Sequence, residues 1–349
     1  MKVAEKQTII PTKIVEGLNI NFEGQIGQID FPISTYETTL FASINRGVKV
    51  SKQHPISVVL ISNNMTRSII LQCKDIFEVK KIVCFLDDEK NNKFKNFQKI
   101  VNTTSNHCKI TNIDEKIVGN LIYLRCSFYT DEASGHNMTT IATNEIAKFL
   151  QNKFSIKYLS NSGNICCDKK VSAINSISGR GKNVIAEIII SKETCKEILK
   201  TDAKKIVDLN IKKNFIGSIV AGSICSANAH YANMLASLYL PFGQDIANIV
   251  EGSQGITYCE VLENGDLYFS VNLTNIICGC VGNGKQLQFV RDNLKLINLM
   301  DKNDNLIKNA SEKMACIFCA VILCGELSLL SALTNQDELV KSHQVFERK

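Results

Sequence analysis

The chain has 349 residues, of which 45% are hydrophobic and 21% are charged, and its formal net charge is +6. This length is enough to bury a sizeable core in one large domain or two smaller ones. The charge is too small, and the lysines are too scattered, for a nucleic-acid-binding protein, so a small anionic ligand suits the balance better. No uninterrupted apolar run reaches the roughly 20 residues that a membrane span requires, and we expect no membrane segment.

The fourteen cysteines lie inside apolar runs and beside glycines, without a regular framework, and no secretory leader is recognisable at the Met1 end. We therefore expect reduced thiols that pack as small hydrophobes in a cytoplasmic protein. Cys316, Cys319 and Cys324 have a spacing that resembles a metal-binding pattern. Because they lie in an apolar helical segment with no nearby histidine, we expect core packing and no metal site.

The first 35 residues are short apolar runs broken by proline and glycine, which predicts strands and turns. From Thr35 onwards, apolar side chains recur at helical spacing, and Ser34 or Thr35 is available as the N-cap. Glu37 would lie in the first turn of this helix, where a carboxylate complements the helix dipole. On local grounds this structural role of Glu37 is as good an interpretation as a catalytic one.

The pattern of residues 55–71 predicts two strands that flank a polar corner, and this corner contains Arg67. The pattern then predicts a helix from Asp75, a strand from Leu121 and a second helix over 139–150. Alternating strands and helices over this stretch indicate a small α+β unit inserted into a larger body.

Residues 160–170 read SNSGNICCDKK, with Asp168, Lys169 and Lys170 behind a turn-forming Ser-Gly-Asn. An ammonium group on such a loop could face an anion or a developing oxyanion, which suggests chemistry on a carbonyl or acyl group. The alternative is a solvated Asp-Lys-Lys turn, because charge runs usually face water.

Downstream, the pattern predicts a strand over 182–190, a helix over 193–217 and a long, small-residue-rich helix over 221–250, which we expect to be central and buried. Asp245 would lie in the later half of this helix and require a partner, and a lysine from residues 160–170 would serve. A hairpin around Asn264-Gly265, a glycine-rich turn and a last apolar helix follow.

Six segments, in this order, resemble the catalytic portion of 3-hydroxy-3-methylglutaryl-coenzyme A (HMG-CoA) reductases: STYETTLFASINRG, SGNICCDKK, AGSICSANAHYAN, FGQD, GCVGNG, and GELSLLSAL with LVKSH. They are similar to the class I-like branch of the family, which ends in a Lys-Ser-His tail and prefers NADPH. The match runs from about Pro32 to Arg348. One such motif is weak evidence, but six in the same order are highly specific.

The resemblance implies an α+β fold, with a large helix-rich domain around a central buried helix and a small inserted ferredoxin-like domain. The large domain would comprise residues 1–67 and 159–349, and the small NADP-binding domain residues 68–158. The family's active site is assembled between two subunits, so the resemblance also implies a homodimer or a higher homo-oligomer.

The implied reaction reduces HMG-CoA with two NADPH to mevalonate and free coenzyme A, without a metal. The resemblance assigns Lys169 to the thioester oxygen and Asp245 to a hydrogen bond with this lysine. It makes Glu37 the acid for the aldehyde oxygen in the second step, and His343 the donor of a proton to the coenzyme A thiolate. Without the resemblance, a lone histidine near the C-terminus would be interpreted as a solvated residue.

Binding residues follow from the same match. The pocket for the substrate would contain Arg67, Ser162, Asp168, Lys170, Lys213 and Asn233. Coenzyme A would contact Ser43, Asn45, Arg46, His230 and Ser328. The nicotinamide cofactor would lie against Asn92, Lys93, Glu132, Ser134, Gly135, His136, Asn137, Met138, Gly282 and Gly284. No GxGxxG motif opens a helix after a first strand, so the sequence does not predict a Rossmann domain.

The chain departs from the family pattern at several of these positions. In the cofactor loop, Glu132 replaces an aspartate, and Ser134 and His136 each replace a methionine. Asn92-Lys93 takes the place of a Ser-Arg pair for the 2′-phosphate, and a lysine can hold a phosphate as a point charge. The family's Glu-Asn dimerisation motif is missing. Two alternatives stay open: the same enzyme using NADH or running in reverse from mevalonate, and a catalytically weak coenzyme A-binding protein.

Overall fold

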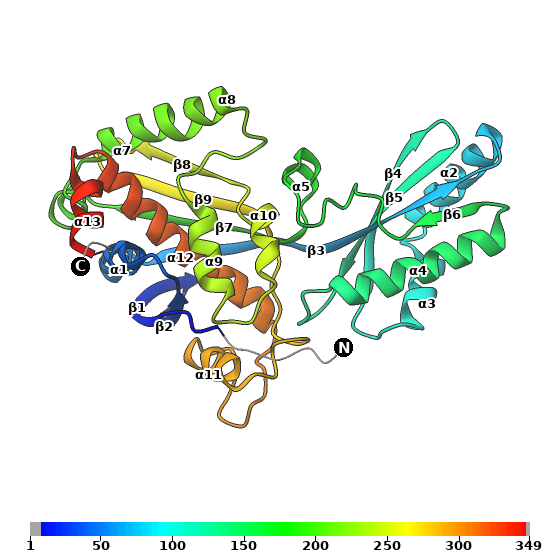
Figure 1. Cartoon of the computed structure of the whole chain (residues 1–349), viewed down its shortest axis with the longest axis horizontal. Coiled ribbons are helices and arrows are strands. Elements are labelled where there is room, and N and C mark those ends of the chain that lie inside the picture. Colours follow the sequence, from blue (N-terminus) through cyan, green and yellow to red (C-terminus); the bar gives the residue numbers. More distant parts are fainter. Residues whose placement is uncertain (1–7, 347–349) are drawn as a thin grey trace.

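The computed structural model describes residues 8–346, which form two bodies joined by one long strand (Figure 1). Residues 1–7 and 347–349 lie outside the described part. They include Arg348, at which the predicted family match ends. The joining strand is β3 (Ile56–Gln72), which pairs with β7 (Gly181–Ile190) over its first half and with β5 (Leu121–Tyr129) over its second. The prediction of two strands with a corner was therefore wrong. The polar residues Asn63 and Asn64 continue the strand and pair with the start of β7.

The larger body is built on a sheet with the strand order β2-β1-β3-β7-β9-β8. The strands β1 (Thr12–Phe22) and β2 (Gln25–Ser34) confirm the extended structure predicted for the first 35 residues. β7 confirms the strand predicted over 182–190, and β8 (Gly255–Val261) and β9 (Leu267–Ile276) form the predicted hairpin around Asn264-Gly265. Only the β1–β3 pair in this order is parallel.

The core of the larger body surrounds α12 (Ala310–Leu333), which packs against α1 (Thr38–Gln53) and against β3, β7 and β9. By length and composition α12 could cross a membrane, with a mean hydropathy of 2.3, but 89% of that window is buried inside the fold. It is therefore placed as the core helix of a folded body. Cys316, Cys319 and Cys324 are buried along it, and within residues 8–346 no group of three His, Cys, Asp or Glu could hold a metal ion.

The central buried helix is thus α12 and not the segment 221–250, for which the prediction was wrong. That segment contains only one longer helix, α9 (Tyr231–Tyr239), and Ala227 forms a bridge with Ile256 on β8. Gly222 and Gly243 have left-handed backbone angles (φ of 73° and 58°), which interrupt helical structure on both sides of α9. The small residues here serve turns and close approaches rather than a long helix.

The smaller body has the element order β3-α2-α3-β4-β5-α4-β6 and the strand order β4-β5-β3-β6. Its own hydrophobic cluster draws its fully buried residues from Ile69 to Ile156. The helix predicted from Asp75 is confirmed, and Asp75 caps it by accepting hydrogen bonds from two backbone N–H groups. Besides β3 and β5, this body contains α2 (Ile76–Asn91), α3 (Lys95–Asn102), β4 (Lys109–Val118), α4 (His136–Lys153) and β6 (Lys157–Ser160).

The helix predicted over 193–217 is interrupted at Lys200, whose φ is 58°, and restarts with Asp202 as the N-cap of α7 (Ala203–Leu209). Two π-helical stretches, η1 (Cys195–Leu199) and η2 (Asn210–Gly217), lie on either side of this break.

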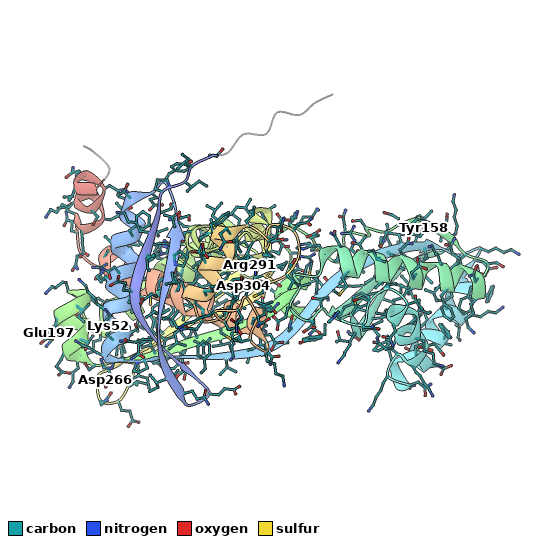
Figure 2. All side chains as sticks on the ribbon, turned by 90° about the horizontal axis from the view of Figure 1, so that it is seen from below. Lys52, Tyr158, Glu197, Asp266, Arg291 and Asp304 are labelled. Carbon is teal, nitrogen blue, oxygen red and sulfur yellow. The ribbon has the colours of Figure 1, made fainter. Side chains whose placement is uncertain are left out.

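Figure 2 shows the two bodies from below, with Arg291 of α11 (Gln288–Leu296) beside Asp304. The two side chains form an ion pair at 2.9 Å. The other helices are α5 (Ala173–Ser178), α6 (Lys192–Thr194), α8 (Ser218–Ala221), η3 (Ile246–Asn248), α10 (Ile249–Gly252) and α13 (Glu338–Phe346).

A substitution at Gly47 tests the packing of α1 on α12. A Cβ atom there would collide with the backbone of Cys324, and overpacking of this kind costs about 1–3 kcal/mol. We expect Gly47→Ala to lower the thermal unfolding midpoint in calorimetry. Gly27→Ala is the matched control, because nothing lies within 4 Å of a Cβ at that exposed position. Equal midpoints for the two variants would contradict the close approach of the helices.

Candidate active site

The loop 160–170 is anchored by a buried ionic network. Arg180, of which 1% of the side chain is exposed, places Nη2 at 2.9 Å from Asp168 Oδ1 and Nη1 at 2.9 Å from Glu251 Oε1. Glu251 Oε1 also accepts a hydrogen bond from the backbone N–H of Lys169 at 3.0 Å. Burial raises the pKa of Glu251, against the opposing effect of Arg180. The network holds Lys169 in a left-handed conformation with a φ of 55°, so the loop is not a freely solvated turn.

Lys169 and Asp245 form an ion pair, with Nζ at 2.6 Å from Oδ2. Asp245 is the N-cap of η3 and not part of a buried helix, and 43% of its side chain is exposed. Burial alone would raise the pKa of Asp245, but hydrogen bonds from Lys169 and from the backbone N–H of Ala247 outweigh it and hold this pKa below its usual value. These partners favour the ionised form of the Asp245 carboxylate, and both side chains are partly exposed and open to a ligand.

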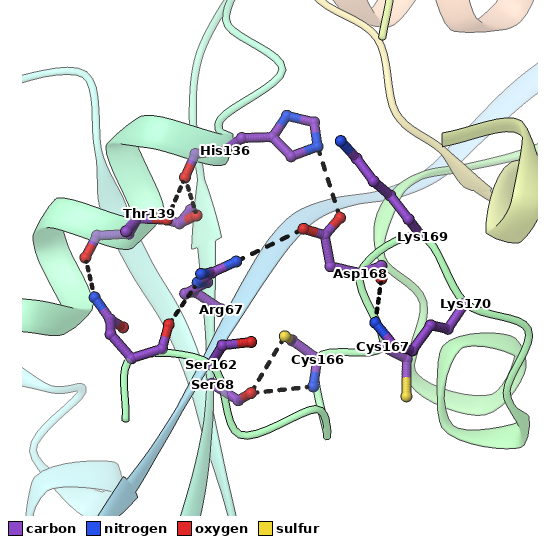
Figure 3. Close-up of polar contacts among 12 residues, drawn as sticks. Arg67, Ser68, His136, Thr139, Ser162, Cys166, Cys167, Asp168, Lys169 and Lys170 are labelled. Atoms are coloured by element: carbon purple, nitrogen blue, oxygen red, sulfur yellow. Dashed lines mark hydrogen bonds and ion pairs between the residues drawn. The ribbon is translucent and has the colours of Figure 1, made fainter. Parts of the chain in front are cut away.

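Two side chains approach the carboxylate of Asp168 besides Arg180, and a third contacts its backbone carbonyl (Figure 3). Arg67 Nη1 lies 3.6 Å from Oδ2, His136 Nε2 lies 3.9 Å from Oδ1, and Lys170 donates a hydrogen bond to the backbone carbonyl of Asp168 at 3.2 Å. Burial lowers the pKa of His136, and the charge of Arg180 lowers it further. Of the predicted substrate residues, the structure brings together Arg67, Ser162, Asp168 and Lys170.

A second cluster lies around the start of α1. Glu37 is the N-cap of this helix, so the prediction of Ser34 or Thr35 as N-cap and of Glu37 in the first turn was wrong. Glu37 Oε2 accepts a hydrogen bond from Asn233 Nδ2 at 2.6 Å, and Oε1 accepts one from Thr39 Oγ1 at 3.1 Å. A cavity of about 410 Å³ opens beside this carboxylate, lined among others by Ser43, Arg46, His230, Asn233, Ser328 and His343.

Arg46 holds one wall of this cavity. Its Nε donates to Ser328 Oγ at 3.0 Å, its Nη1 lies 2.5 Å from Glu338 Oε1 on α13, and Ser43 Oγ donates to the same Ser328 hydroxyl at 3.0 Å. Four of the five predicted coenzyme A residues thus line one cavity. The fifth, Asn45, lines a neighbouring hollow with Lys13 and Lys52.

The two clusters are not joined within one chain. Over residues 8–346, no hydrogen bond or ion pair connects Glu37 with Lys169 or Asp245. Over the same residues, no hydrogen bond or ion pair connects Lys213 to either cluster. It lies in η2, where burial lowers its pKa. The catalytic residues expected from the sequence therefore form one half around Lys169 and another around Glu37.

Most of the predicted cofactor residues share one surface. The loop 131–138 packs against the loop 279–284, with Cys280 N–H donating to Glu132 O at 2.8 Å and Ala133 forming a bridge with Val281. Gly279 has no room for a Cβ beside the backbone of Ser134. Ser134 to Met138 lead into the N-terminus of α4, where free N–H groups suit an anion. Asn92 and Lys93 lie apart, at the C-terminal end of α2, and over residues 8–346 no hydrogen bond links them to this loop.

Glu132 has a different use from the one predicted. Its carboxylate accepts hydrogen bonds from the backbone N–H groups of Ala310 at 3.0 Å and Ser311 at 2.6 Å, which are the first two residues of α12. A carboxylate at this position satisfies otherwise unpaired donors and complements the helix dipole. Because its oxygens already hold α12, the geometry favours a structural role for Glu132 over a contact with the cofactor.

Sequence reasoning missed three buried charged residues: Arg180, Glu251 and Glu326. Glu326 lies in the apolar run ILCGELSLL and Glu251 in ANIVEG. A carboxylate inside an apolar run requires buried partners, and that was the available signal. Their partners could not be read from the sequence, because Arg180 and Glu251 are 71 residues apart.

A lysine paired with an aspartate beside an arginine, together with a glutamate and histidines around a second cavity, are groups that enzymes use on anionic carbonyl compounds. Comparison with known proteins makes the class specific. The family model described as hydroxymethylglutaryl-coenzyme A reductase matches residues 7–348. The chain therefore belongs to the hydroxymethylglutaryl-coenzyme A reductase family of oxidoreductases.

Named relatives agree with this assignment. The chain is 37% identical to the 3-hydroxy-3-methylglutaryl-coenzyme A reductase of Pyrococcus horikoshii over 97% of this chain and 81% of that protein. It is 37% identical to the enzyme of the same name from Methanocaldococcus jannaschii, over 97% of this chain and 82% of that one. Among solved structures, a class II reductase from Streptococcus pneumoniae, described as bound to NADPH, has a TM-score of 0.70 at 14% identity and covers 94% of this chain and 86% of its own. This last likeness concerns the fold.

Removal of the Glu132 carboxylate tests its structural role. We expect Glu132→Ala to lower the free energy of unfolding by about 1–2 kcal/mol, because two donors of α12 lose their partner. Glu145→Ala is the control, since Glu145 pairs only with exposed neighbours and should change stability by less than about 0.5 kcal/mol. Chemical denaturation measures both. Equal stability of the two variants would show that Glu132 does not anchor α12.

Proposed function

We propose that this protein reduces HMG-CoA to mevalonate and free coenzyme A with two NADPH, in the cytoplasm. The observation that carries the proposal is the Lys169–Asp245 pair, which is held on an anchored loop in a chain of this family. The nicotinamide cofactor would supply the hydride at each of the two reduction steps. The fourteen cysteines are all free thiols, which suits a reducing compartment.

Lys169 would stabilise the negative charge that forms on the thioester oxygen when the carbonyl carbon is reduced. A fixed ammonium suits this task because it is already oriented before the charge develops. Asp245 would orient this ammonium through its contact at 2.6 Å. Glu37, held by Asn233, would donate a proton to the aldehyde oxygen, and His343 in the same cavity would protonate the departing thiolate.

The substrate carboxylate would bind at Arg67, with Ser162, Lys170 and Lys213 as further donors, while Asp168 would accept a hydrogen bond from the substrate. A guanidinium suits a carboxylate because it can donate two parallel hydrogen bonds. Coenzyme A would occupy the cavity lined by Ser43, Arg46, His230 and Ser328 and extend to Asn45. Glu338 now pairs with Arg46, so an incoming phosphate would compete with this carboxylate.

The loop 134–138 with Gly282 and Gly284 would hold the nicotinamide cofactor. Space at Gly282, where nothing lies within 4 Å of a Cβ, and the α4 N-terminus fit an extended anionic cofactor. The NADPH-bound relative supports NADPH rather than NADH, and Lys93 with Asn92 would hold the 2′-phosphate. We also assign the smaller body, residues 68–158, to the ferredoxin-like class, because its connectivity is β-α-β-β-α-β with the additional helix α3 before β4. The boundaries of this domain fall inside β3 and β6.

The separation of the two clusters supports a shared active site. The Lys169 half of one subunit would face the Glu37 half of a second copy of this chain, so that a homodimer or higher homo-oligomer completes each site. Each half is held by hydrogen bonds within its own chain.

Oxidation of NADPH in the presence of HMG-CoA tests the role of Lys169. We expect Lys169→Ala to lower kcat about 100-fold or more, because the developing oxyanion loses its ammonium. Lys148→Ala is the matched control, since Lys148 also contacts a carboxylate at 2.6 Å but on a surface helix, and it should keep wild-type kcat. Equal rates for Lys169→Ala and wild type would remove this lysine from the mechanism. No turnover by the wild type with either NADPH or NADH would instead support a coenzyme A-binding homologue.

Mixed subunits test the shared site. Lys169→Ala and Glu37→Gln should each be inactive alone. Equal mixtures co-expressed in one cell should regain about a quarter of wild-type activity, because random pairing gives half heterodimers and each heterodimer has one intact site. Heterodimers purified through two different tags should show about half of wild-type activity, because one of their two sites is intact, and the activities of the mixture and of the purified heterodimers are both measured. If heterodimers are as inactive as the parent variants, both halves must come from the same chain.

A further inference from the structure

Glu326 is a fully buried carboxylate on α12 to which the proposed chemistry assigns no role. Four neutral groups donate to it: the backbone N–H groups of Ala229 at 2.6 Å and His230 at 3.1 Å, the hydroxyl of Thr257 at 2.8 Å, and Asn214 Nδ2 at 3.5 Å. Over residues 8–346 no cation lies within ion-pair distance of it. Burying a charge that only neutral groups stabilise costs free energy. We therefore expect this carboxylate to have a structural or functional role.

The first consequence of this carboxylate is the position of α9. The N–H groups of Ala229 and His230 immediately precede this helix, and His230 is its N-cap. One turn further along, Asn233 donates to Glu37 at 2.6 Å. Glu326 therefore fixes, through two backbone N–H groups, the turn from which both His230 and Asn233 reach the Glu37 cavity.

The second consequence concerns the charge of Lys213. Lys213 Nζ donates to Asn214 Oδ1 at 3.1 Å, and the amide of Asn214 points to Glu326, so a side-chain amide links the ammonium to the carboxylate. Burial lowers the pKa of Lys213, and the negative charge of Glu326 opposes that effect. Both Lys213 and Asn214 lie in the π-helical stretch η2, an irregularity often found at functional sites.

The other titratable groups that face Glu326 do not compete for this role. Burial raises the pKa of Tyr231 well above its usual value, with Glu326 adding to the effect. Burial raises the pKa of Cys259 to about 12. Both groups stay neutral over the working pH range, so Lys213 is the group whose charge Glu326 controls.

We infer that Glu326 is a positioning residue for the Glu37 half of the active site, which holds the turn 229–230 and keeps Lys213 protonated for an anionic carboxylate ligand. The inference rests on the proposed function only in taking that ligand to be the HMG moiety. Glu326 itself touches no substrate. Its effect on binding passes through Lys213, and its effect on the acid passes through Asn233.

A titration of Lys213 tests the electrostatic part without requiring turnover. Lysines carrying isotope-labelled methyl groups are followed by NMR, and the Lys213 signal is assigned by its loss in Lys213→Met. Glu326→Gln keeps the volume and removes the charge, so the pKa of Lys213 must fall, while that of the exposed Lys212 stays constant. If Glu326→Gln does not fold, Glu326→Asp is used instead. The aspartate side chain is shorter by one methylene group, so its charge lies further from Lys213, and the pKa of Lys213 must fall by a smaller amount. An unchanged pKa of Lys213 in a folded variant overturns the inference.

Steady-state kinetics test the consequence for binding. We expect Glu326→Gln to raise KM for HMG-CoA about tenfold at pH 9 relative to wild type, and less at pH 7, because the neutral lysine loses a charge-assisted hydrogen bond. In a Lys213→Met background the same substitution should leave KM unchanged at both pH values. A KM effect that is independent of pH and persists without Lys213 contradicts the role. A wild type that does not turn over HMG-CoA refutes the proposed function, while the NMR titration still decides the inference.

Discussion

The candidate site depends on the buried guanidinium of Arg180, which lies between the carboxylates of Asp168 and Glu251. A buried charge of this kind is costly unless it is paired, and breaking such a pair typically costs about 3–5 kcal/mol. Glu251 uses the same oxygen to accept the backbone N–H of Lys169. The network therefore fixes the direction in which this lysine leaves the loop, and its ammonium meets Asp245 while both remain open to solvent.

Two long elements carry the remaining functional groups. β3 runs through both sheets and brings Arg67 to the junction of the two bodies, where it meets Asp168 from the loop that follows β6. α12 carries Glu326 and Ser328 next to the second cavity, and Glu132 holds its N-terminus. α12 is almost fully buried, and Arg67 lies on β3 among the buried residues Met65, Thr66 and Ser68. Each half of the site is therefore supported by side chains that are packed in the core.

Local pattern was sufficient for much of this fold. Short apolar runs broken by proline and glycine indicated β1 and β2, the Asn264-Gly265 turn indicated the hairpin of β8 and β9, and helical periodicity from Asp75 indicated α2. The prediction failed where a distant partner decides the structure. Asn63 and Asn64 suggest a turn, but pairing with β7 keeps them in a strand. The small residues of 221–250 suggest a packed helix, but here they allow a turn to approach β8.

The same limit applies to the site. The match to a family located Lys169, Asp245 and Glu37, whereas the residues that orient them came only from the fold. The geometry separates the charged groups: the Lys169 half is rich in cations, and the Glu37 half contains a carboxylate and two histidines. Thioester reduction requires both a cation at the oxygen and a proton donor. If association brings the halves together, completion of the reaction requires two subunits, because the ammonium at the oxygen and the proton donor would come from different chains.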